Sequence, residues 1–246
     1  MYKQILEKKA EFVSLLPDDQ EFFDWLDQSN LWCWIYSVFK ITGQPISKST
    51  IVPMLSGEIR DDIPLSLYAF AKDLRDIYAD MKSFISMQAD LDKKMLNRWA
   101  EMIFETDREA PAGKPYRLKN PVVREWDLIP LHFRSIDEEL DVPIKKAARI
   151  KDFQDPLSAV SWLHLEIDRM YPYGENTVTA AFLAVLYRLM QLGIPMPQLQ
   201  MEPDEYNRAV AKYVNRSDIS GFNNTLMRSI YSRLDNICSM IRQAQK

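Results

Sequence analysis

The stretch MYPYGENTVTAAFLAVLYRLMQLGIPMP, residues 170–197, decides the fold of this chain. A turn rich in proline, glycine and asparagine separates two segments whose apolar residues have helical spacing. A helix that begins after such a turn offers unpaired backbone N–H groups and the positive end of its dipole to an anion. The turn itself contains few side chains that do chemistry. The stretch therefore predicts the backbone arrangement of an anion-binding site without the side chains that usually act in one.

Apolar residues recur at intervals of three and four along most of the chain. This spacing puts one apolar stripe on each helix and predicts a mainly helical fold. The clearest stripes are Leu67, Phe70, Leu74 and Ile77; Met95, Trp99, Met102 and Ile103; Phe182, Val185, Leu186 and Leu189; and Leu226, Ile230, Leu234 and Ile237.

One segment departs from helical spacing. In PYRLKNPVVREWDLI, residues 115–129, β-branched and aromatic residues flank Asn120 and Pro121, which predicts a short β-hairpin. Elsewhere the pattern predicts an N-terminal helical segment over residues 1–25 and one helical domain over residues 26–246.

Composition and charge narrow the classes of function. The chain has 246 residues, of which 47% are hydrophobic and 27% charged, as in soluble globular proteins. Its net charge is -4 and its basic residues are scattered, which argues against nucleic-acid binding. We expect no membrane span, because no apolar run is long enough.

The expected location follows from the N-terminus and the cysteines. Charged residues interrupt the first apolar segment, so we expect no cleaved signal peptide. Cys33 and Cys238 lie in apolar-periodic stretches and are expected to be buried free thiols in a reducing compartment. The chain is expected to be cytoplasmic, or delivered without a cleaved signal peptide.

Two further groups of residues have alternative interpretations. Trp25, Trp32 and Trp34 have helical spacing that predicts core positions, although an interaction face is the alternative. His164 and Asp168 are four residues apart, which predicts a satisfied pair on a helix surface, with a base and its orienting carboxylate as the alternative.

Residues 171–182 resemble, without a gap, the hallmark motif of Fic (Fido) domains. That motif reads His-Pro-Phe, any residue, Asp or Glu, Gly-Asn-Gly-Arg, and after two residues a second Arg. The aligned positions here are Tyr171, Pro172, Tyr173, Glu175, Asn176, Thr177, Val178, Thr179 and Phe182. Downstream, Gly193-Ile194-Pro195 matches the family's Gly, any residue, Pro. Upstream, His164 falls where the family commonly has a His.

Two other segments resemble the family in the same order. Gly113, Tyr116 and Arg117 match the Gly-Tyr-Arg pattern that leads into the family's β-hairpin flap. The flap residues implied here are Tyr116, Arg117, Leu118, Val122 and Val123. Near the N-terminus, Val38, Thr42 and Gly43 align with an autoinhibitory motif of Ser or Thr, three residues, Glu, then Gly or Asn. The resemblance covers residues 30–240 and implies a Fic-like helical bundle with a hairpin flap.

The departures from the motif bear on activity. In the family, the motif His takes a proton from a target hydroxyl, which attacks the phosphate of a nucleotide such as ATP. Tyr171 stands at that position, and an ordinary tyrosine pKa of about 10 is too high for a base near neutrality. The two phosphate-binding Arg positions hold Thr179 and Phe182, which offer no charge.

Other departures concern the phosphate loop and the metal. Asn176 and Val178 replace the two glycines, so the backbone nest that holds phosphate should be altered. Thr177 replaces the motif Asn. Glu175 matches the family's Mg²⁺ position, but a lone carboxylate is a poor metal site without substrate phosphates. Loss of the inhibitory Glu at Thr42 is consistent with loss of the Arg that it would restrain. No cofactor is therefore expected.

Three hypotheses follow. The first is a pseudoenzyme or protein-interaction module that binds a protein partner by strand addition along the flap edge, Tyr116 to Val123. The second is a transferase that uses another nucleotide-linked donor, nucleotidyl or glycosyl, with Mg²⁺, to modify a protein hydroxyl. Its pocket would be lined by Glu175, Thr177, Thr179 and His164. The third, adenylylation with a strongly lowered Tyr171 pKa, is disfavoured because phosphate recognition is missing too.

Overall fold

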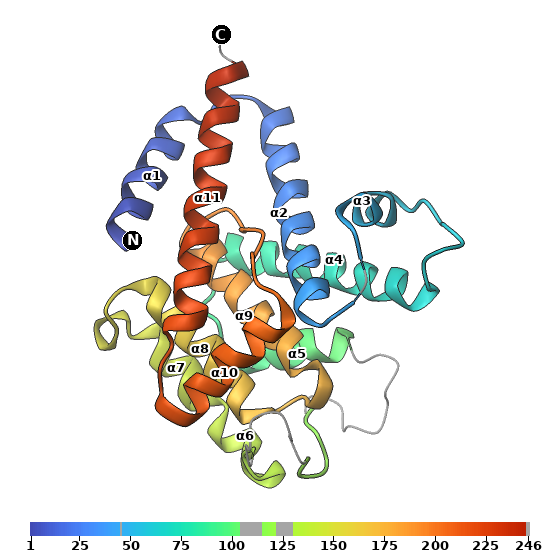
Figure 1. Cartoon of the computed structure of the whole chain (residues 1–246), viewed down its shortest axis with the longest axis vertical. Helices are drawn as coiled ribbons and strands as arrows, with labels where there is room; N and C mark the ends of the chain where they lie inside the picture. Colours follow the sequence, from blue (N-terminus) through green and yellow to red (C-terminus); the bar gives the residue numbers. More distant parts are fainter. Residues whose placement is uncertain (45, 104–114, 122–129, 245–246) are drawn as a thin grey trace.

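The structure is a computed structural model that describes residues 1–44, 46–103, 115–121 and 130–244 (Figure 1). Every regular element in these residues is a helix, so the predicted helical class is confirmed. The elements are α1 (Tyr2–Leu15), α2 (Gln20–Ile41), α3 (Lys48–Ser56), α4 (Leu65–Ser86), α5 (Lys93–Ile103), η1 (Phe133–Ser135), α6 (Ile136–Glu139), α7 (Asp141–Ala148), η2 (Ile150–Asp152), α8 (Pro156–Met170), η3 (Gly174–Asn176), α9 (Thr177–Gln191), α10 (Pro203–Arg216) and α11 (Ser220–Ala244).

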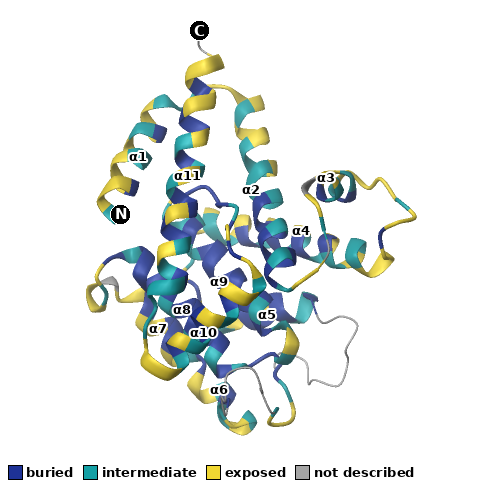
Figure 2. Ribbon diagram, in the orientation of Figure 1, coloured by how far each residue is buried: buried dark blue, intermediate teal, exposed yellow. Residues whose placement is uncertain are grey.

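Helices α8 and α9 form the centre of the bundle (Figures 1 and 2). Both helices bury most of their residues, because neighbours cover them on several sides: α7, α10 and α11 contact α8, and α2, α4 and α5 contact α9. Large side chains fill the contacts, as where Trp99 of α5 packs against Tyr187 of α9 at 5.3 Å between ring centroids. The stretch quoted first therefore forms the core.

The predicted apolar stripes face this core. All four stripe residues of α9 are buried, as are the four in α11. In α4, Leu74 and Ile77 are buried and the two earlier stripe residues pack partly buried against the core. In α5, Met102 is partly buried and the other three are buried.

Helix α1 lies along α11, so the first and last helices of the chain are neighbours (Figure 1). Lys8 forms an ion pair of 2.8 Å with Asp235, and Lys9 Nζ donates a hydrogen bond of 2.5 Å to the Leu192 carbonyl after α9. Residues 25 and 26, where the sequence predicted a division, both lie inside α2.

The predicted β-hairpin is absent from the part of it that the structure describes. Residues 115–121 have no strand, while Gly113, Val122 and Val123 lie outside the described residues. Proline at both ends removes two backbone donors, and the Arg117 N–H donates to the Pro172 carbonyl at 3.0 Å. Residues 115–121 therefore contact the turn before α9 and contain no strand.

Other sequence predictions have mixed outcomes. Cys33 and Cys238 are buried and free, as predicted. Trp34 is buried and Trp32 is partly buried, but Trp25 is exposed, so its predicted core position is wrong. It is near the start of α2, where the helix has fewer neighbours. None of the described helices has the length and apolar run needed to cross a bilayer.

Candidate functional site

The turn between α8 and α9 begins with a residue in a left-handed conformation. Tyr171 has φ 51° and ψ 48°, and its backbone N–H donates to the carbonyls of Ile167 and Asp168, which ends α8. Gly174 has φ 61°. For a residue with a side chain this conformation costs about 1–2 kcal/mol, so surrounding contacts must hold Tyr171 in place.

Arg117 supplies those contacts from the segment of residues 115–121. Its Nε donates to the Tyr171 carbonyl at 2.7 Å, and its Nη1 donates to the Lys119 carbonyl and to Asn120 Oδ1. Nη2 donates to the Leu131 carbonyl. Burial lowers the pKa of Arg117, but the guanidinium stays charged because its ordinary value is so high. The Arg117 side chain thus connects three parts of the chain: its own segment at residues 119–120, Leu131, and the turn at Tyr171.

A hydrogen bond connects the turn to the first residue of α9. Thr177 Oγ1 accepts a hydrogen bond of 3.0 Å from the Tyr173 N–H, and both side chains are buried. Asn176 has φ −87° and ψ 3°, and Val178 lies within α9. Neither position has the positive φ that glycine would favour. Glu175 is exposed at the surface of the turn.

The two positions aligned with the phosphate-binding arginines lie inside the protein. Thr179 is 2% exposed and Phe182 is 1% exposed. The Phe182 ring lies 4.5 Å from the His164 ring, 6.0 Å from Phe222 and 6.3 Å from Tyr206. The Phe182 side chain therefore belongs to a buried aromatic cluster with His164, Tyr206 and Phe222, while Thr179 is simply buried.

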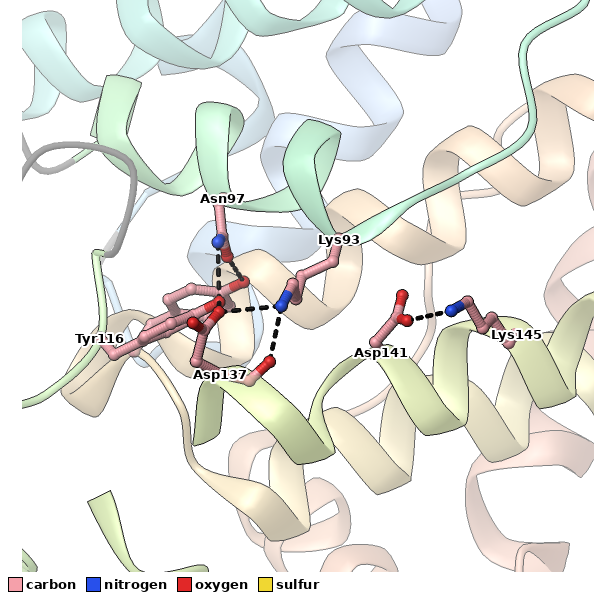
Figure 3. A network of polar contacts seen from close by, with 7 residues as sticks. Lys93, Asn97, Tyr116, Asp137, Asp141 and Lys145 are labelled. Atoms are coloured by element: carbon pink, nitrogen blue, oxygen red, sulfur yellow. Dashed lines mark hydrogen bonds and ion pairs between the residues drawn. The ribbon is translucent and has the colours of Figure 1, made fainter. Parts of the chain in front are cut away.

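A polar network joins the turn to α5 and α6 (Figure 3). The Tyr173 hydroxyl donates to Asn97 Oδ1 at 2.8 Å, and Asn97 Nδ2 donates to the Tyr116 hydroxyl at 2.7 Å. That hydroxyl donates to Asp137 Oδ1 at 3.2 Å, and Lys93 forms a 2.8 Å ion pair with the same carboxylate. Burial raises the pKa of Tyr116 to about 12, so it remains a protonated donor.

His164 and Asp168 are fully buried, so the prediction of a surface pair is wrong. They meet through Tyr206 of α10, whose hydroxyl lies 2.8 Å from His164 Nε2 and donates to Asp168 Oδ2 at 3.0 Å. His164 also stacks on Phe222 at 4.2 Å. Burial lowers the pKa of His164 to about 3 and raises the pKa of Asp168 to about 7. Helical spacing alone could not show that α8 is covered on this side.

The residues aligned with the autoinhibitory motif form the C-terminus of α2. Val38 is buried, and Thr42 Oγ1 donates to the Val38 carbonyl at 2.9 Å. Gly43 has φ 73°, the left-handed conformation that commonly ends a helix. These three residues terminate α2.

Of the predicted flap residues, two face inward. Tyr116 is buried in the polar network and Arg117 is bonded to the turn, whereas Leu118 is 47% exposed. Pro172 is buried beside Tyr173. No group of three or more His, Cys, Asp or Glu suited to a metal ion occurs in the described ranges.

Sequence reasoning missed Asn97, Tyr206, Lys93 and Asp137, which organise the region around the turn. One signal was available. Asn97 lies between apolar residues of the helical stripe in KKMLNRWAEMI, and a buried polar residue needs partners.

Comparison with solved structures identifies the fold. The chain superposes on a Fic-domain-containing signalling protein from Bacteroides thetaiotaomicron with a TM-score of 0.80 and 14% identity, covering 98% of this chain and 97% of that one. Fic-1 from C. elegans gives a TM-score of 0.77 at 12% identity, with coverages of 99% and 73%. A Fic family protein from Desulfovibrio desulfuricans gives 0.67 at 15% identity, with coverages of 98% and 74%.

No protein-family model and no curated protein sequence matches the chain. The likeness therefore concerns the fold, which is that of Fic-domain proteins over nearly the whole chain.

Proposed function

We propose that this chain is a Fic-fold protein with a degenerate motif, that it has lost the family's nucleotidyl transfer, and that it acts by binding another protein. One observation carries the proposed loss of nucleotidyl transfer. Phe182, which aligns with the second phosphate-binding arginine, is a core side chain surrounded by His164, Tyr206 and Phe222. A position that packs the core is unsuited to holding a phosphate.

The rest of the turn supports the same proposal. The backbone N–H of Tyr173 already has an acceptor in Thr177, so this donor is not free for an anion. Thr179 is buried and carries no charge. Tyr171 has a phenol where the motif has an imidazole, and an ordinary phenol keeps its proton near neutral pH.

The alternative is a transferase that uses another nucleotide-linked donor together with Mg²⁺. Glu175, exposed at the turn, is the feature that favours it. Three other residues expected to line its pocket, His164, Thr177 and Thr179, are buried, which weighs against it. Under the proposed function, the chain therefore acts without a bound nucleotide or metal ion.

Thermal unfolding of the full chain with candidate donors separates the two functions. A ligand at about 100 times its Kd adds roughly 2.7 kcal/mol of stability, or several degrees in Tm for a protein of this size. We expect no shift with ATP, ADP, CDP-choline, UDP-sugars or GDP-sugars, with or without Mg²⁺. A shift that the substitution Glu175→Ala removes would favour the transferase, and a mass increase on a target protein would establish it.

The described part of the predicted flap edge suggests where the partner binds. Because Tyr116 and Arg117 face the turn, Leu118 is the described apolar side chain left for contact. We expect Leu118→Asp to weaken capture of the partner from a lysate without lowering Tm. Tyr231→Phe on α11, away from this segment, provides the control, and equal capture by both variants would contradict the proposed contact.

A further inference from the structure

Helix α1 has more apolar surface than its packing against α11 covers. Ile5 and Phe12 are buried on the side of α1 that contacts α11. Leu6 is 46% exposed and Val13 is 55% exposed, although each directly follows one of those buried residues. Successive residues of a helix are turned by about 100°, and residues seven apart return to the same side. Leu6 and Val13 therefore form a second apolar stripe, beside the one that packs against α11.

This exposed stripe lies at the edge of the bundle. Ala10, which is also exposed, lies one turn after Leu6 and adds a small side chain to the border of the stripe. Figures 1 and 2 show α1 on the outside of the molecule with α11 beside it, and α11 is the described helix with which α1 makes its main contact. An apolar stripe that the described part of the chain leaves uncovered suits contact with another protein.

Opposite charges lie at the two ends of the stripe. Lys3 lies about one turn before Leu6, and its side chain is 90% exposed and 4.0 Å from Glu7 in a loose ion pair. Asp18 is exposed in the turn that follows α1, and none of the described cations lies within 4.0 Å of its carboxylate. The stripe therefore begins beside an accessible ammonium group and ends beside an accessible carboxylate.

Two copies of this stripe complement each other when the helices run antiparallel. Leu6 of one copy then lies opposite Val13 of the other. In this register Lys3 lies next to Asp18 of the second copy, and the two-fold axis repeats the pair. Ala10 lies near the axis, where its small side chain lets the two helices approach closely. A parallel pair would instead bring like charges together at each end, so the charges favour the antiparallel arrangement.

We propose that α1 pairs antiparallel with α1 of a second copy of this chain, through the stripe of Leu6, Ala10 and Val13. Lys3 of each copy forms an ion pair with Asp18 of the other. Because α1 has 14 residues, the contact is small, and the expected dimer is weak and depends on protein concentration. The stripe is on a different helix from the turn between α8 and α9, so the dimer does not depend on whether nucleotidyl transfer has been lost.

Sedimentation equilibrium of the full chain over a range of concentrations tests the pairing. We expect a reversible equilibrium between monomer and dimer. L6E/V13E should raise the dimer Kd by more than about tenfold, because the two-fold axis brings four carboxylates into one apolar contact. The control V52E/V142E replaces two exposed apolar residues of α3 and α7 and should leave Kd unchanged. All four positions are exposed, so circular dichroism should show the wild-type fold in both variants.

Charge exchange tests the register. K3E and D18K each place like charges opposite one another at both ends of the contact, so each should raise Kd by about threefold to tenfold. K3E/D18K restores opposite charges with their positions exchanged and should return Kd close to the wild-type value. A loss of helix stability within one copy would not be repaired in this way, because the rescue requires the second copy.

A crosslink near the axis provides an independent measurement. Cys33 and Cys238 are buried, so A10C adds an exposed thiol that meets its own copy across the axis. A short bismaleimide should therefore join two chains of A10C. The matched control S14C places an exposed thiol on the same helix, about one turn farther from the axis in each copy, and should give little crosslinked product.

Three results would overturn the proposal. One is a wild-type chain that stays monomeric up to its solubility limit, since the stripe would then be left for a different protein. Another is a dimer whose Kd is the same in L6E/V13E as in the wild type. The third is a K3E/D18K variant that dimerises no better than either single variant, because the antiparallel register requires the rescue.

Discussion

The guanidinium of Arg117 donates a 2.7 Å hydrogen bond to the backbone carbonyl of Tyr171, a residue in a left-handed conformation. The two residues are 54 positions apart, so this bond fixes the turn before α9 from a distant part of the chain. Arg117 therefore binds the backbone of Tyr171, the residue at the position that the Fic resemblance assigns to a catalytic base.

Removing this cation should loosen the turn. We expect Arg117→Ala to lower the free energy of unfolding by about 2 kcal/mol, because several carbonyls lose a charged donor. Faster amide exchange at residues 171–174 should accompany the loss. Arg208→Ala, at an exposed position of α10, provides a matched control and should cost less than about 0.5 kcal/mol. Equal effects in urea denaturation would show that Arg117 does not hold the turn.

Introducing an arginine at position 182 tests whether that position is part of the core. Phe182→Arg should cost at least about 3 kcal/mol or prevent folding, because it places a charge among buried aromatic rings. Phe182→Leu should cost about 1–2 kcal/mol and remain folded. Circular dichroism with urea denaturation measures both. Near-wild-type stability of Phe182→Arg would remove the main support for lost phosphate recognition.

The two tyrosines of the network should be energetically coupled. Tyr173 and Tyr116 share Asn97 as a hydrogen-bond partner, so removal of one hydroxyl changes what the other contributes. A double-mutant cycle with Tyr116→Phe and Tyr173→Phe should give an interaction energy of about 0.5–2 kcal/mol in urea denaturation. Strict additivity would mean that the network is not cooperative.

Asp168 and His164 should influence stability in opposite directions as pH changes. Burial raises the pKa of Asp168 from 3.8 to about 7, so the folded chain keeps a proton that the unfolded chain releases. Its contribution to stability therefore falls between pH 4 and pH 7. Burial lowers the pKa of His164 from 6.5 to about 3, so its contribution rises between pH 3 and pH 6.5.

These opposing trends predict the behaviour of Asp168→Asn. The variant keeps only the histidine contribution, so its stability relative to wild type should increase from pH 4 to pH 7, by at most about 1.4 kcal/mol per pH unit. Urea denaturation across this range measures the difference. A constant difference would mean that the Asp168 carboxyl has an ordinary pKa in the folded chain.

The helices were predictable from the sequence because their evidence is local. The stripe Phe182, Val185, Leu186 and Leu189 predicts α9, and all four residues are buried. The order of the Fic-like segments also anticipated the fold that the structural comparison supports. In each case the prediction depends on spacing along one helix or on the order of segments.

The errors arose where neighbours from distant segments decide the environment. His164 and Asp168 have the spacing of a surface pair, but Tyr206, 42 and 38 residues later, covers them. The hairpin pattern could not show that the Arg117 N–H bonds to Pro172. Trp25 has the spacing of a core residue, yet it lies where α2 has few neighbours.

The pairing of α1 with α11 has a consequence for the order of folding. Lys8 and its partner Asp235 are 227 residues apart, so the ribosome makes α1 long before the helix that α1 packs against. Closing so long a loop is slow relative to local helix contacts, and α8 and α9 can pair as soon as both emerge. The N-terminal helix should therefore dock late, only after α11 has emerged, and this docking buries Ile5 and Phe12.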